Sequence, residues 1–299
     1  LLVAHGLVCP MQHVERAFVQ PGWMPEADAL ELRAALRPGA RVVILGAGFI
    51  GCETAATARK LGADVTVVGP GELPILRPLG REFAAEVMRR QQHDGTKFAM
   101  GRRVADLIGQ AVVEGVRLDD DTEIACDVFI EAIGSHANIE WLEGQDIDLS
   151  NGVVTNGNLN ARKATEGVWP DVYSIGDVAS FPNPIFDDIP RRVEHWNIPT
   201  ECAKYIGARV AAELAIAGGS AEAVVPEAPF KPIPSFWSDQ FDMHILAFGL
   251  LALADEARLI EGDINDDFVF GYYREGKMVG VAGVGMRSVV QGYRKAFEA

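Results

Sequence analysis

The chain has 299 residues, of which 48% are hydrophobic and 23% charged, and its formal net charge is −15. This length and composition predict a globular protein of about two domains, and the negative charge argues against nucleic acids and anionic membranes as partners. The four scattered cysteines form no CxxC pair and no cluster with histidine, so neither a disulfide framework nor a metal site is expected, and no apolar run reaches the roughly 18 residues that cross a bilayer.

The chain opens on an apolar, strand-like segment, Leu1 to Gly6, and not on Met. The opening has neither the basic region nor the cleavage site of a signal peptide. We therefore expect a cytoplasmic protein, and we expect further residues to precede Leu1.

The segment from 41 to 69 has the pattern strand, tight turn, helix, strand. Arg41 to Leu45 is a β-branched apolar run, typical of a strand buried on both faces of a parallel sheet. An Ala-rich stretch from Cys52 to Leu61 predicts a helix that Gly62 ends, and Asp64 to Val68 predicts a second buried strand. The segment is thus one βαβ unit.

Three glycines, Gly46, Gly48 and Gly51, join the first strand to the helix. In a dinucleotide-binding turn the first permits a tight turn, the second lets the backbone approach a pyrophosphate, and the third allows close helix–strand packing. The phosphate would lie at the helix N-terminus, where free N–H groups and the positive end of the helix dipole meet it. Phe49 and Ile50 complete this candidate site. A purely structural glycine-rich turn is the alternative.

The position expected to read the adenosine ribose is Gly69. A carboxylate there would accept both ribose hydroxyls, and an arginine there or just after it would bind a 2′-phosphate. The nearest acid is Glu72 and the nearest cation is Arg77, so the choice between NADH and NADPH stays open. Glu53, placed in the first turn of the helix, either stabilises that turn electrostatically or contacts the nicotinamide side of the nucleotide.

The rest of the chain predicts two further groups of elements. An amphipathic helix is expected at 81–95, followed by a hairpin around the acidic turn DDDT, and the run 124–133 returns the chain to the sheet. A short strand at 172–175 and a helix at about 198–217 come next. Four prolines between 226 and 234 predict a linker, beyond which we expect a small sheet with a closing helix. Three isolated histidines are not expected to bind metal; they are His93, His136 and His244.

Five segments resemble the FAD-dependent pyridine-nucleotide oxidoreductases, in particular the ferredoxin reductases that serve cytochromes P450 and aromatic-ring dioxygenases. The segments are RVVILGAGFIGCETAATARKLGADVTVV, IEAIGSHANIEWLE, VYSIGDVASFPNP, RRVEHWNIPTECAKYIGARVAAELA and PIPSFWSDQFDMHILAFG. The last two are the most specific, because FWSDQ is hard to explain by the fold alone.

The resemblance implies an α/β fold in which a Rossmann-like NAD(P)-binding domain is inserted in a partial FAD-binding domain, with a small C-terminal α/β domain of reductase dimerisation type. The implied boundaries are 14–140 for the NAD(P) domain, 1–13 and 141–225 for the FAD domain, and 226–299 for the C-terminal domain. In such enzymes FAD carries the chemistry from NAD(P)H to a ferredoxin-type iron–sulfur acceptor, so no catalytic side chain is implied. The implied cofactor-binding residues are Gly46, Gly48, Phe49, Ile50, Gly51, Glu53 and Arg77 for the nicotinamide nucleotide, and Gly134, Gly176, Asp177, Glu194, His195, Trp196 and Trp237 for FAD.

The sequence also departs from the family's pattern. Met24 stands where an arginine often precedes the first NAD-domain helix, Ala137 replaces the proline of a Gly-x-x-Pro-Asn element, and His5 replaces the threonine of an ATG segment. The N-terminal βαβ unit that holds the ADP half of FAD in the family is not in the sequence. These departures motivate an alternative hypothesis, a non-catalytic nucleotide-binding or scaffold relic of the same fold.

Two other flavoprotein classes are less favoured. A thioredoxin reductase would carry CxxC in its NAD domain, and a glutathione reductase would carry a C-terminal His-Pro signature. An apoptosis-inducing-factor-like protein would carry basic surface for DNA, against the net charge of −15. A ferredoxin partner would need a basic patch, and either a monomer or a homodimer is expected. The candidate patch residues are Arg191, Arg192, Arg287, Arg294 and Lys295.

Overall fold

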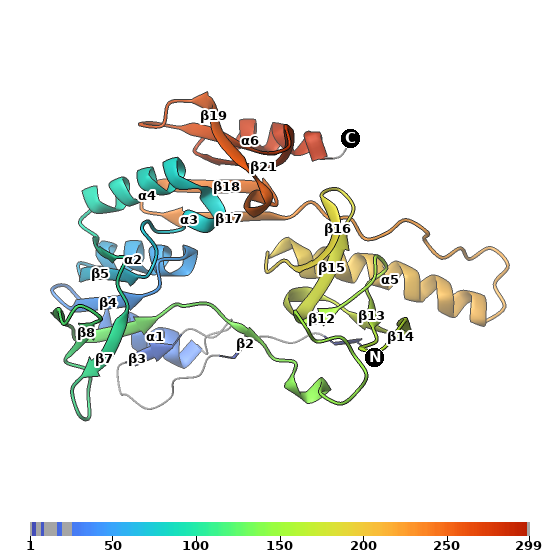
Figure 1. The fold of residues 1–299 in the computed structure, drawn as a ribbon, viewed down its shortest axis with the longest axis horizontal. Coiled ribbons are helices and arrows are strands. Elements are labelled where there is room, and N and C mark those ends of the chain that lie inside the picture. The colour runs from blue at the N-terminus through green and yellow to red at the C-terminus, as the bar shows by residue number, and fades with distance from the viewer. Residues whose placement is uncertain (1, 4–6, 9–16, 20–25, 298–299) are drawn as a thin grey trace.

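The computed structural model describes residues 2–3, 7–8, 17–19 and 26–297. Figure 1 shows three lobes: a parallel lobe at the left (17–131), a middle lobe at the right (β1 and β2 with 136–217), and a C-terminal lobe across the top (235–297). The Pro-rich segment from 226 to 234 contains no helix or strand, which confirms it as the connection between the last two lobes.

The parallel lobe is built on a five-stranded sheet in the order β3-β10-β4-β5-β6, in which all neighbours are parallel. Its strands are β3 (Ala17–Val19), β4 (Arg41–Leu45), β5 (Asp64–Gly69), β6 (Lys97–Met100) and β10 (Val128–Glu131). The helices α1 (Glu26–Ala35) and α2 (Phe49–Lys60) belong to the same lobe. The predicted βαβ unit is therefore confirmed.

Alternation along β4 explains why the sheet is covered on both faces. Val42 and Ile44 share a core with buried alanines of α2, and Val43 belongs to a second core on the opposite face. That second core includes a small antiparallel sheet of β7 (Val104–Ile108), β8 (Gly115–Leu118) and β9 (Glu123–Ala125). The pairing of β8 with β9 confirms the hairpin predicted at the acidic turn.

The middle lobe consists of short strands and one long helix. Its strands are β1 (Leu2–Val3), β2 (Leu7–Val8), β11 (His136–Ala137), β12 (Val153–Val154), β13 (Asn160–Arg162), β14 (Val168–Ser174), β15 (Ala179–Asn183) and β16 (Asp187–Arg192). The short 3-10 helices η1 (Glu140–Leu142) and η2 (Gly176–Val178) lie among them. The predicted helix is α5 (Asn197–Ala217), whose buried Ile198 and Cys202 pack against Tyr173 and Phe181.

The C-terminal lobe is an antiparallel sheet in the order β17-β18-β21-β20-β19. Its elements are β17 (Ser235–Gln240), β18 (Met243–Gly249), η3 (Leu251–Leu253), β19 (Glu256–Gly262), β20 (Phe268–Arg274), β21 (Lys277–Val284), α6 (Arg287–Tyr293) and η4 (Arg294–Phe297). The sheet and closing helix expected here are confirmed.

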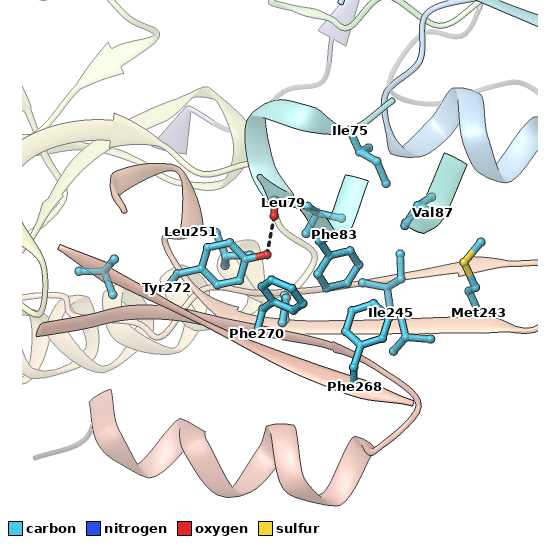
Figure 2. Packing of buried hydrophobic residues seen from close by; sticks show 14 residues of the cluster. Ile75, Leu79, Phe83, Val87, Met243, Ile245, Leu251, Phe268, Phe270 and Tyr272 are labelled. Atoms are coloured by element: carbon cyan, nitrogen blue, oxygen red, sulfur yellow. Dashed lines mark hydrogen bonds between the residues drawn. The ribbon is translucent and has the colours of Figure 1, made fainter. Parts of the chain in front are cut away.

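Two short helices of the parallel lobe, α3 (Leu76–Leu79) and α4 (Arg81–His93), attach it to the C-terminal sheet. Figure 2 shows Phe83 of α4 against Phe268 and Phe270 of β20, with the Phe83 and Phe268 ring centroids 4.9 Å apart. Tyr272 donates its hydroxyl to the carbonyl oxygen of Leu79 at 2.8 Å. This interface is a fully buried apolar core, so the two lobes pack as one body.

Within the described ranges, no helix combines the length and apolar character that crossing a bilayer requires.

Candidate functional site

At Gly46 and Gly51, where β4 joins α2, there is no space for a side chain. Gly46 has φ +114°, and a Cβ added there would lie 2.2 Å from the carbonyl oxygen of Ala132. A Cβ on Gly51 would lie 1.9 Å from the carbonyl oxygen of Gly46. Both contacts are with backbone, which cannot move aside, so the turn is closed tightly against β10 and α2.

Gly48 differs from the other two, because nothing in its surroundings requires glycine. Its φ of −81° suits any residue, and a Cβ added there would meet no atom within 4 Å. It is the N-cap of α2 and makes no side-chain cap hydrogen bond. The first N–H groups of α2 thus face open space beside a position without a side chain, which is the geometry that accepts a diphosphate. Phe49 and Ile50 begin α2 beside it.

The loop after β5 packs directly on the glycine turn. Ile75 donates its N–H to the carbonyl oxygen of Ala47 at 2.8 Å. A Cβ added at Gly69 would lie 3.0 Å from Ala47 Cβ and 3.4 Å from Met100 Cε. A side chain at position 69 would therefore require these neighbours to shift, which favours the glycine that the sequence shows there.

The charged residues of that loop lie at its surface. Glu72 pairs with Arg81 at 2.5 Å, and each side chain is 69% exposed. Arg77 of α3 is also exposed. Arg102 is a further cation near the expected position of the adenosine ribose, because its backbone N–H donates to the carbonyl oxygen of Gly69 at 3.1 Å.

Glu53 lies in the second turn of α2, because the helix begins at Phe49. The prediction that it occupies the first turn was wrong, and its stabilising effect on the helix terminus is correspondingly weaker. Its Oε1 accepts a hydrogen bond from Ser238 Oγ of β17 at 2.5 Å. Burial raises the pKa of the Glu53 carboxyl, the Ser238 hydrogen bond opposes the rise, and the negative charge of Asp239 adds to it.

Aromatic side chains continue from the glycine turn into the middle lobe. Phe49 of α2 contacts Phe236 of β17 with ring centroids 4.9 Å apart, and His195 packs on the other side of the contact at 5.3 Å from Phe236. The ring centroids of Trp196 and Trp237 lie 6.4 Å apart, and the two residues are 83% and 55% exposed. Burial lowers the pKa of His195 to about 4, and its buried Nδ1 has no hydrogen-bond partner among the residues that the structure describes.

The remaining candidates are Gly134, Gly176, Asp177 and Glu194. Glu194, next to His195, accepts a hydrogen bond from Ser135 at 3.2 Å, which brings the loop containing Gly134 to the same place. Burial raises the pKa of Asp177, the charge of Glu194 adds to the rise, and that of Arg192 opposes it.

Gly176, beside Asp177 in η2, has φ +73° and only Pro199 near its Cβ position. A backbone that turns here without a side chain is consistent with close approach by a ligand.

Comparison with known proteins gives two family matches. Residues 21–200 match the model of the pyridine nucleotide-disulphide oxidoreductases, and residues 235–299 match the reductase C-terminal model. The chain belongs to the pyridine nucleotide-disulphide oxidoreductase family. The first match covers the parallel sheet with its glycine turn, and the second covers the separate C-terminal sheet.

One curated relative of the chain is the ferredoxin–NAD(+) reductase component of the anthranilate 1,2-dioxygenase system of Burkholderia cepacia. It is 31% identical over 280 residues, which are 91% of this chain and 63% of the relative. The chain spans less than two thirds of the length of the first curated relatives that it matches.

Two solved structures have a fold similar to that of this chain. A ferredoxin reductase from Rhodopseudomonas palustris is 26% identical with a TM-score of 0.82, over 98% of this chain and 69% of that one. Putidaredoxin reductase, in a covalent complex with putidaredoxin, is 23% identical with a TM-score of 0.84, over 99% of this chain and 68% of that one. At that identity the second likeness shows the fold alone.

Sequence reasoning missed three side chains that the fold brings to the site: Ser135, Phe236 and Ser238. The segment FWSDQ was recognised as specific, but only Trp237 was selected from it. The alternating pattern of a strand was the available signal, because it places Phe236 and Ser238 on the face opposite Trp237.

Arg191 and Arg192 are two of the candidate docking cations. Arg191 pairs with Asp187, which also pairs with Arg274 of the C-terminal lobe. Arg192 pairs with Glu194 and donates to the carbonyl oxygen of Asp177 at 3.1 Å, so it lies at the candidate site. Met24 and His5, where the sequence departs from the family pattern, lie outside the described residues.

Proposed function

We propose that this chain carries the nucleotide and flavin sites of an FAD-dependent NAD(P)H oxidoreductase that passes electrons to a ferredoxin-type iron–sulfur protein. The observation that carries the proposal is the continuity of the two sites through β17. Phe236 contacts Phe49 at the glycine turn and also His195 beside the exposed tryptophans. A nucleotide bound at the turn and a flavin bound at the tryptophans would thus lie within reach of each other.

The residues of the parallel lobe fit a nicotinamide nucleotide. The diphosphate would bind the free N–H groups at the start of α2, with Gly46, Gly48 and Gly51 keeping side chains away. Arg77 would lie on the adenosine side and Glu53 on the nicotinamide side.

Residues of the middle lobe, together with Trp237 of the C-terminal lobe, fit the flavin portion of FAD. Trp196 and Trp237 offer exposed aromatic faces. Ser135 links the loop of Gly134 to Glu194, and Arg192 links Glu194 to Asp177, which follows Gly176. When bound, FAD supplies the conversion of a two-electron hydride transfer into single-electron steps. Burial lowers the pKa of His195, so it presents an uncharged ring to this site near neutral pH.

The acceptor and the domain division are part of the same proposal. Relatives named as ferredoxin reductase components of dioxygenase systems support a ferredoxin acceptor. We assign residues 14–140 to the NAD(P) domain, 1–13 and 141–225 to the FAD domain and 226–299 to the C-terminal domain. The protein would work in the cytoplasm, as a monomer or homodimer.

The test uses the full-length protein loaded with FAD and mixed anaerobically with NADH or NADPH. Bleaching of the visible flavin bands, followed by reduction of an added ferredoxin, is the expected result. Gly48→Trp should abolish bleaching while leaving the flavin bound, because it fills the diphosphate position only. Nucleotide binding with no bleaching and no reduction of a dye acceptor would contradict the proposal and favour the non-catalytic alternative.

A further inference from the structure

A line of hydrogen bonds joins three buried polar side chains to Glu53. Gln91 of α4, Gln240 and Ser238 of β17 are each 0% exposed. Gln91 Nε2 donates to Gln240 Oε1 at 2.8 Å, and Gln240 Nε2 donates to Ser238 Oγ at 2.9 Å. Ser238 Oγ then donates to Glu53 Oε1 at 2.5 Å. We call these four side chains the polar relay; it runs from the parallel lobe into the C-terminal lobe and back.

A backbone carbonyl fixes the direction of every bond in the polar relay. The oxygen of Cys52 can only accept, and Gln91 Nε2 donates to it at 3.3 Å. The same nitrogen faces Gln240, which must therefore present its oxygen and turn its own nitrogen toward Ser238. The Ser238 oxygen accepts that bond, so its single hydrogen is available for Glu53. The carboxyl at the end of the relay thus always receives a donor.

The last bond of the polar relay controls the carboxyl of Glu53. A donated hydroxyl favours the ionised form, whereas burial and the nearby charge of Asp239 favour the neutral form. Asp239 is itself bonded to His244, at 2.6 Å. The neighbouring Cys52 thiol is buried, and its pKa is raised to about 12, so it adds no charge.

The bond also orients the carboxyl. It occupies Oε1, and among the described residues Oε2 has no hydrogen-bond donor. Glu53 lies one turn beyond the helix start where the diphosphate would bind. A carboxylate with one oxygen held and the other open is suited to accept an N–H from the nicotinamide end of the nucleotide.

We propose that Ser238 and Gln240 are positioning residues that hold Glu53 as an oriented carboxylate for the nicotinamide end of the nucleotide. This rests on the proposed function, because it assumes that the nucleotide lies along α2. Through these two residues the C-terminal lobe would affect the binding of the nicotinamide nucleotide without touching it.

The experiment compares Ser238→Ala with Ser235→Ala in the FAD-loaded protein. Ser235 is on the same strand, and its only hydrogen bond to a side chain uses its backbone N–H, so its side chain lies outside the relay. Ser238→Ala should weaken NADH binding about tenfold, the value of one hydrogen bond to a charged group. Gln240→Met should have a smaller effect, because the Ser238–Glu53 bond survives, and Ser235→Ala should have none.

The pH dependence of NADH binding separates positioning from a loss of stability. Ser238→Ala removes the donor that favours the ionised Glu53, so the pH below which NADH affinity falls should rise by about one unit. A merely structural role for Ser238 would leave that pH unchanged. Wild-type affinity with an unchanged pH midpoint in Ser238→Ala would overturn the proposal.

Carbon NMR can follow the titration of the Glu53 carboxyl directly, without bound nucleotide. This measurement tests the polar relay independently of the proposed function. If the wild-type protein transfers no electrons, the proposed function fails, but the relay is still judged by that titration. A Glu53 carboxyl that titrates at the same pH in the wild type and in Ser238→Ala overturns the relay whether or not the nucleotide binds.

Discussion

Replacing Gly48 by alanine should leave the fold intact and weaken nucleotide binding. The added methyl group meets no atom within 4 Å, and φ −81° with ψ −173° is open to alanine. Alanine restricts the unfolded chain, which stabilises the protein by about 0.4–1 kcal/mol. It is also a poorer N-cap than glycine, by roughly 1 kcal/mol. The two effects nearly cancel, so the free energy of unfolding should change by less than about 1 kcal/mol.

The effect on the ligand should be much larger. The methyl group would occupy the space through which a diphosphate reaches the N–H groups of α2. Losing one hydrogen bond to a charged group costs about 1.5–3 kcal/mol, which corresponds to a roughly ten- to hundredfold weaker Kd. Titration with NADH and NADPH, followed by nicotinamide fluorescence, measures this change, and urea unfolding measures stability.

Gly51→Ala is the matched control, since it makes the same chemical change three residues further along. Its Cβ would lie 1.9 Å from the carbonyl oxygen of Gly46, so the turn must deform. We expect a loss of stability above about 3 kcal/mol. If Gly51→Ala unfolds like the wild type, or if Gly48→Ala binds both coenzymes with unchanged affinity, the geometric account of the turn is wrong.

Three further predictions test the surroundings of the site. Tyr272→Phe should cost about 1–2 kcal/mol, because it leaves the buried carbonyl oxygen of Leu79 without its donor; unchanged urea unfolding would contradict this. Burial lowers the pKa of His195 from 6.5 to about 4, so folding stability should be lost as the pH falls through that interval. His195→Phe should remove this slope, and a slope that persists would assign it to another group. Gly69→Asp should destabilise the protein by roughly 1–3 kcal/mol, because its Cβ would lie 3.0 Å from that of Ala47; a melting temperature equal to that of the wild type would contradict this.

The βαβ unit could be predicted because its signals are local. The buried strand, the glycine spacing and the alanine-rich helix follow one another within 29 residues, from Arg41 to Gly69, and backbone sterics act over the same distance. The absence of an acid at Gly69 was visible in the sequence. Its cause, the packing of the 69–75 loop on Ala47, was not.

The partners of Glu53 could not be predicted, because they are distant in sequence. Ser238 is 185 residues away, and the bond forms only after α4 has brought the C-terminal sheet against the parallel lobe. A single sequence contains no signal for such a contact. From the sequence, Glu53 is expected either to stabilise the helix or to contact the nucleotide. Neither interpretation predicts a hydrogen bond to another lobe.

The two faces of β17, the strand that contains FWSDQ, have different surroundings. Trp237 is 55% exposed and lies beside Trp196, whereas Ser238 and Gln240 are fully buried against α2 and α4. Substituting an outward residue should change the flavin side, and substituting an inward residue should change the nucleotide side. The five residues from 236 to 240 are therefore the segment in which substitutions should best distinguish the two proposed cofactor sites.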